Sequence, residues 1–134
     1  MASDLNLEAV IGFEGNIKNG LCYVKRDSID YLVYALGSTI VVKNINANTQ
    51  SFCQGHSNKV SCITVSNDGS MIASGQQNYT GFKADVIIWS LDAVIANANT
   101  PDRSGELMHR LTLHHGRVQD IAFSYDDQFL ATVG

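Results

Sequence analysis

The chain has 134 residues, of which 45% are hydrophobic and 16% are charged, and its formal net charge is -4. This composition can bury a core, which excludes a disordered tail, and no run approaches the ~20 apolar residues of a membrane span. Nine Lys and Arg are scattered along the sequence against 13 Asp and Glu, so we expect no basic stripe and no nucleic-acid or membrane partner.

Short apolar segments rich in Val, Ile, Tyr and Phe follow one another along the chain, separated by turn-forming residues such as those at 67–69. This pattern predicts β-strands at 7–13, 21–24, 31–36, 39–45, 50–54, 60–65, 71–74, 86–89, 107–113, 118–123 and 129–133. The nearest helical candidate, residues 91–96, is too short to form against the cost of a first helical turn. The predicted fold class is therefore all-β.

Part of the sequence is repeated. A shift of 58 residues aligns His56 with His114, Val60 with Val118 and Ile63 with Ile121, and the match continues at Ser66, Asp68 and Ala73. A fainter copy upstream aligns residues 40–45 with residues 86–91 at a spacing near the ~40–45 residues of a four-stranded propeller blade. The longer step of 58 then implies an insertion.

The middle copy contains, in order, Gly55-His56, a strand at 60–66, a turn at 67–70 and strands at 71–75 and 86–90. This order resembles a WD repeat, with Trp89-Ser90 in the place of the Trp-Asp dipeptide. The resemblance implies a WD-repeat β-propeller, in which a buried hydrogen-bond chain joins His56, Ser74 and Trp89. The family's Asp, six residues before the Trp, is Lys83 here, and Asp85 lies two residues later.

A propeller closes with 4–8 blades. This chain is predicted to hold about two complete blades and part of a third, as the amino-terminal part of a longer protein. The predicted division is 1–19 as closing strand and lead-in, 20–54 as first blade, 55–113 as second blade with long loops, and 114–134 as the start of the third. In the family, residues 7–13 would be the outer strand of the last blade.

Two long loops, 76–85 and 92–105, interrupt the second blade. Loops of this length on a rigid sheet are where binding tends to be placed. The first is interpreted either as a partner contact or as an ordinary surface loop, and the second, rich in Asn, is predicted to be disordered. The candidate contact residues are Gln77, Tyr79, Phe82, Lys83 and Arg103.

Catalytic and metal sites are not predicted. His109, His114 and His115 with Asp120 lack a ligand pattern, and His114 is interpreted as a turn histidine. Ser74, His56 and Asp85 supply a serine, a histidine and a carboxylate, but no nucleophile elbow surrounds Ser74. The chain is therefore predicted not to be an enzyme and to need no cofactor or small-molecule substrate.

Three strings, at 7–13, 54–62 and 81–89, resemble the amino terminus of the ciliary and flagellar branch of the family, whose members line the inside of axonemal doublet microtubules. The resemblance implies a structural protein of the axonemal cytoskeleton that binds tubulin and other microtubule inner proteins. The alternative is a cytosolic WD-repeat scaffold for transient protein–protein interactions. Three cysteines without C-x-x-C spacing, and a first segment unlike a signal peptide, predict a reduced intracellular compartment.

Overall fold

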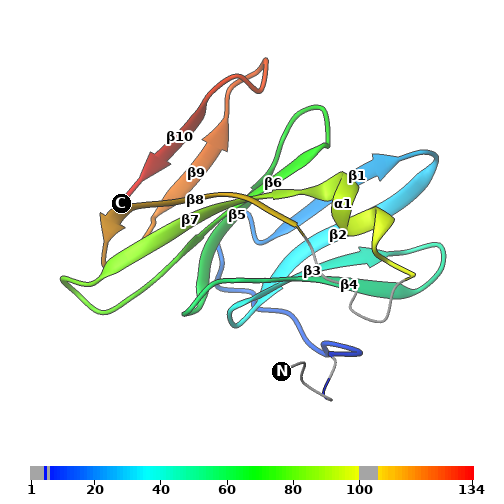
Figure 1. Cartoon of the computed structure of the whole chain (residues 1–134), viewed down its shortest axis with the longest axis horizontal. Helices are drawn as coiled ribbons and strands as arrows, with labels where there is room; N and C mark the ends of the chain where they lie inside the picture. Colours follow the sequence, from blue (N-terminus) through cyan, green and yellow to red (C-terminus); the bar gives the residue numbers. More distant parts are fainter. Residues whose placement is uncertain (1–4, 6, 100–105) are drawn as a thin grey trace.

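The structure is a computed structural model that describes residues 5, 7–99 and 106–134. Within these residues, ten strands form three antiparallel sheets that lie side by side (Figure 1). The first sheet has the order β1 (Leu21–Arg26), β2 (Ile29–Leu36), β3 (Thr39–Asn44) and β4 (Thr49–Gln54). The second has the order β5 (Val60–Val65), β6 (Met71–Gln76), β7 (Lys83–Ser90) and β8 (Glu106–His115). The third pairs β9 (Asp120–Phe123) with β10 (Leu130–Val133). The all-β prediction of two complete blades and part of a third is confirmed.

Turn chemistry explains why consecutive strands pair. Asp27 and Ser28, the two residues between β1 and β2, have φ values of 51° and 66°. Positive φ at both central residues is the mark of a two-residue hairpin turn whose twist matches that of the flanking strands. Arg26 therefore pairs directly with Ile29, and the register continues without a bulge to Leu21 opposite Tyr34.

Two apolar cores hold the three sheets together. The core between the first and second sheets is built from buried side chains of both, among them Val33, Ile40, Val42, Ile63, Ile72, Ile87 and Trp89. The core between the second and third sheets contains Cys62, Ala73, Ala84, Val86, Val118 and Ile121. Gly75 permits this second contact, because a Cβ there would lie 2.6 Å from the Cβ of Val118.

A short helix, α1 (Leu91–Ala96), follows β7, so the prediction that residues 91–96 would not form a helix was wrong. The Ser90 side chain accepts a hydrogen bond from the Ala93 N–H and caps the first turn, while Leu91 and Val94 are buried. Cap and burial together offset the nucleation cost that the isolated segment would face. No helix among the described residues is long and apolar enough to cross a membrane.

The segment 7–13, predicted as a strand, is irregular in the structure. It runs across the face of the first sheet that points away from the second sheet (Figure 1, blue). Leu7 and Val10 pack there against a small core of Tyr34, Val41 and Phe52. Its backbone is held by a side chain rather than by a neighbouring strand, because Gln50 bonds both the N–H and the C=O of Val10.

Candidate interaction surface

A buried hydrogen-bond chain crosses the second sheet on the face that packs against the first sheet. The Trp89 Nε1–H donates to Ser74 Oγ at 2.9 Å, and Ser74 Oγ lies 2.7 Å from His56 Nε2. His56 Nδ1 lies 2.8 Å from Gln76 Oε1, and Gln76 Nε2 donates to Ser57 Oγ at 3.1 Å. Gly55 lets the backbone before His56 pass close to the indole ring, because a Cβ at this residue would lie 2.9 Å from Trp89 Cη2.

The donors and acceptors in this chain assign one tautomer to His56. Gln76 Oε1 can only accept a hydrogen bond, so His56 Nδ1 carries the proton. Nε2 is then free to accept from the Ser74 hydroxyl, whose oxygen already accepts from Trp89. Burial lowers the pKa of His56 below its ordinary value, although its bond to Gln76 opposes the shift. His56 is therefore a neutral link in a fully satisfied chain.

The fourth member of the chain is Gln76, which the sequence analysis did not identify. Asp85, the carboxylate that the sequence left as a candidate, instead accepts from Arg110 Nη1 at 2.7 Å and Thr112 Oγ1 at 2.9 Å. Lys83, which stands at the family's Asp position, is exposed at the start of β7. The sequence did contain a signal for Gln76. It follows Ser74 by two residues, so both side chains lie on the same face of β6.

A second, shorter version of the same contact joins the second and third sheets. His114 Nε2 lies 2.8 Å from Thr132 Oγ1, and the 58-residue shift that aligns His56 with His114 also aligns Ser74 with Thr132. His114 lies at the end of β8 rather than in a turn, which corrects the earlier interpretation. The repeat in sequence is thus also a repeat in hydrogen bonding.

The β6–β7 loop, residues 77–82, presents two aromatic rings to solvent. Tyr79 and Phe82 are 78% and 62% exposed, and their rings meet edge to face at a centroid distance of 6.5 Å. The turn between them is closed by a hydrogen bond from the Phe82 N–H to the Tyr79 C=O. Gln77, also predicted as a contact, is half-buried, and its N–H donates to the C=O of Lys59.

Backbone bonds tie this loop to the segments beside it. The Asn78 N–H donates to the Gly116 C=O, and the Gly116 N–H donates to the Phe82 C=O at 2.8 Å. Asn78 Nδ2 also donates to the Lys83 C=O at 2.9 Å. The segments 55–59, 77–83 and 115–119, which we call the loop end, therefore form one connected surface.

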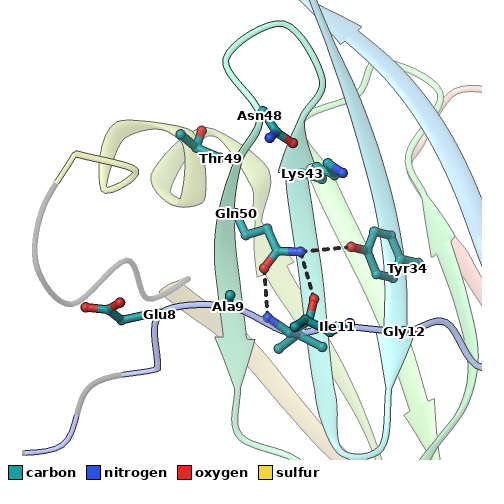
Figure 2. Close-up of a pocket in the computed structure, with 10 residues that line it drawn as sticks. Glu8, Ala9, Ile11, Gly12, Tyr34, Lys43, Asn48, Thr49 and Gln50 are labelled. Carbon is teal, nitrogen blue, oxygen red and sulfur yellow. Dashed lines mark hydrogen bonds between the residues drawn. The ribbon is translucent and has the colours of Figure 1, made fainter.

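A hollow lies on the outer face of the first sheet and is shown in Figure 2. It has a volume of about 610 Å³ and lies between the segment 8–12 and strands β2 to β4. Gln50 points into it and bonds both Val10 and the Tyr34 hydroxyl, while Lys43 lies beside it on β3. The segment 8–12 thus forms one wall of the hollow and partly covers the outer face of the first sheet.

The serine, histidine and carboxylate that the sequence supplies do not form a catalytic triad in the structure. Ser74 is fully buried, and the carboxylate of Asp85 accepts hydrogen bonds from Arg110 and Thr112 rather than from Ser74 or His56. Within residues 5, 7–99 and 106–134, no group of three or more His, Cys, Asp or Glu could hold a metal ion. Arg103, and the part of the predicted disordered loop from 100 to 105, lie outside the described residues.

Comparison with known proteins adds an independent observation. The family described as "WD domain, G-beta repeat" matches residues 47–90 and 105–134. The chain is 42% identical over 133 residues to "Cilia- and flagella-associated protein 52" of Mus musculus and 44% identical over 135 residues to the protein of that name in Chlamydomonas reinhardtii. These alignments cover 98% and 100% of the chain but only 19% and 20% of the relatives. "WD repeat-containing protein 90" of Mus musculus is 30% identical over 131 residues, which is 97% of the chain and 6% of that protein.

Proposed function

Because this chain belongs to the WD-repeat family, we propose that it works as a non-catalytic scaffold of the ciliary or flagellar axoneme. In this role it binds tubulin and other inner proteins of the doublet microtubule. The observation that carries the proposal is the 40–44% identity, over nearly the whole chain, to proteins named for cilia and flagella in mammals and an alga. The chain spans about a fifth of the length of these relatives, so the proposed role is that of a full-length protein of this kind.

The geometry supports a binding role rather than a chemical one. The polar groups of the second sheet are used internally, because Trp89, Ser74, His56 and Gln76 satisfy one another in a buried chain. The loop end instead presents exposed aromatic and charged side chains on a tethered backbone. Surfaces of this kind, held by a rigid sheet, suit protein contacts.

Localisation with salt extraction tests the proposal. The tagged protein, expressed in ciliated cells, is expected to enter the axoneme and to stay there at about 0.5 M salt, where exposed ion pairs are strongly screened. Tyr79→Ala with Phe82→Ala is expected to weaken retention, while Tyr125→Ala, a 96% exposed aromatic in the β9–β10 turn, serves as the matched control.

Two results would contradict the proposal. Uniform cytosolic signal without axonemal enrichment would favour the alternative of a transient cytosolic scaffold. Complete release at mild ionic strength would show that the protein is not embedded in the microtubule lattice.

A further inference from the structure

The fold separates charges that the sequence scatters. Three loops at one end of the second and third sheets carry Lys59, Lys83 and Arg117, and Lys18 lies close by through its bridge to Cys62. The carboxylates of described residues near this loop end are Glu14, bonded by Asn16, Asp120, paired with Lys18, and Asp85, paired with Arg110, which also bonds the Gly55 C=O. A chain with net charge -4 therefore has a locally basic end.

The opposite end is acidic. We call the β1–β2, β5–β6 and β9–β10 turns together with α1 the turn end, which lies away from the β6–β7 loop in Figure 1. It carries Asp27, Asp68, Asp92, Asp126 and Asp127, with Arg26 paired to Asp92. On the adjoining strand ends, Lys25 and Lys43 accompany Asp30. The molecule is thus electrically bipolar, which the scattered order of Lys and Arg in the sequence did not predict.

The cations of the loop end are available to a partner. Lys59, Lys83 and Arg117 are all exposed, and within the described part of the chain none of them forms an ion pair. Their spacing is set by backbone contacts, because Gln77 bonds the Lys59 C=O and forms a bridge with Arg117, while Lys83 pairs in register with His115. The backbone positions of these three charges are therefore preset, and only their side chains must become ordered when a ligand binds.

Two further features at this end suit an extended peptide. A polar cleft of about 170 Å³ is lined by Lys59 and Arg117 and also by Glu14. The exposed Tyr79–Phe82 pair stands on the adjoining loop and offers an apolar contact beside the charges. Aromatic side chains and arginine are the groups that most often anchor protein interfaces.

We propose that the loop end binds an acidic peptide segment of a partner protein, with its carboxylates on Lys59, Lys83 and Arg117 and an apolar side chain on Tyr79 and Phe82. The inference rests on the proposed function, which places a partner contact on the same loop. The acidic turn end repels such a segment, so the charge separation also orients the partner toward one end of the molecule.

Fluorescence anisotropy on the full 134-residue chain tests the inference. The probe is a fluorescein-labelled peptide with eight glutamates around a central phenylalanine, and saturable binding that weakens with added salt is expected. Lys83→Glu with Arg117→Glu should raise Kd at least tenfold. The matched control, Lys25→Glu with Lys43→Glu, makes the same change in net charge at the other end and should change Kd less than threefold. Circular dichroism checks that both variants fold alike.

Three outcomes would overturn the inference. They are no binding of the glutamate peptide by the folded wild-type chain, equal loss of binding in the two double variants, and tighter binding of an oligouridine RNA than of the peptide. Failure here is separable from failure of the proposed function. A protein that is retained in axonemes but ignores the peptide overturns only this inference, whereas peptide binding by a protein that never enters the axoneme supports it and contradicts only the proposed function.

Discussion

The first and second sheets have the same four-stranded order but solve the same structural problem differently. Alignment of residues 40–45 with 86–91 places Lys43 of β3 where β7 has Trp89. The strand registers then place Tyr34 where the second sheet has Ser74, because Lys43 pairs with Leu32 and Trp89 pairs with Ile72. The equivalent positions thus form a closed hydrogen-bond chain in the second sheet, whereas in the first sheet they line an open hollow.

The difference shows what the hydrogen-bond chain contributes. In the second sheet Trp89 is 1% exposed, and no buried side-chain nitrogen or oxygen of the described residues near it lacks a hydrogen-bond partner. In the first sheet the segment 7–13, held through Gln50, packs on the equivalent face. A four-stranded sheet of this kind can therefore form without the polar chain, which in the second sheet ties the β4–β5 connection to β6 and β7.

The largest difference in stability between equivalent positions of the two sheets is expected when the indole of Trp89 is removed. Trp89→Ala deletes the largest fully buried side chain and also leaves Ser74 without a donor, so a loss of about 3–5 kcal/mol in the free energy of unfolding is expected. Lys43→Ala at the equivalent position should change it by less than about 0.5 kcal/mol. Urea unfolding measures both, and equal losses would contradict the comparison.

Removal of the central hydroxyl tests the chain without a large cavity. Ser74→Ala leaves the Trp89 N–H without its acceptor and His56 Nε2 without its donor, which should cost about 1–3 kcal/mol. The counterpart in the first sheet, Tyr34→Phe, removes a single partly buried bond to Gln50 and should cost about 1 kcal/mol or less. Thermal unfolding of the two variants side by side would refute the expectation if Tyr34→Phe proved the more harmful.

The pH dependence of stability should report on His56. Burial holds the pKa of the folded residue below 6.5, so in the interval below 6.5 the unfolded chain binds a proton that the folded chain does not. The contribution of neutral His56 is therefore fully present above pH 6.5 and is lost progressively as the pH falls below that value. Urea midpoints measured from pH 7.5 to 5.5 should fall in the wild type and change less in His56→Asn. Parallel curves would show that another group controls the trend.

A small effect on stability is expected when the segment 7–13, which crosses the face of the first sheet, is released. Gln50→Ala removes both bonds to the Val10 backbone and should free residues 7–13 with a loss of about 1 kcal/mol or less, because these bonds are only partly buried. Hydrogen exchange at the Val10 amide should accelerate in this variant but not in Thr49→Ala, its exposed neighbour. Unchanged exchange in Gln50→Ala would show that apolar packing of Leu7 and Val10 holds the segment.

Much of the fold follows from local patterns, and the misses have physical causes. Ten of the predicted strands appear in the structure, because alternation of apolar residues and turn residues such as Asp27-Ser28 act over a few positions. Helix α1 was missed because the Ser90 cap and the burial of Leu91 and Val94 stabilise it, and the burial depends on tertiary contacts. The segment 7–13 has strand-like composition, but it pairs with no strand among the residues that the structure describes.

The sequence by itself determined the positions of ten strands, the repeat and the family resemblance, since these depend on residue types at fixed spacings. The tertiary structure alone decided that Gln76 completes the chain of His56, Ser74 and Trp89, because that contact joins a turn to two different strands. It also decided the charge separation. Lys59, Lys83 and Arg117 are far apart in sequence, and only the pairing of three loops at one end of the sheets brings them together.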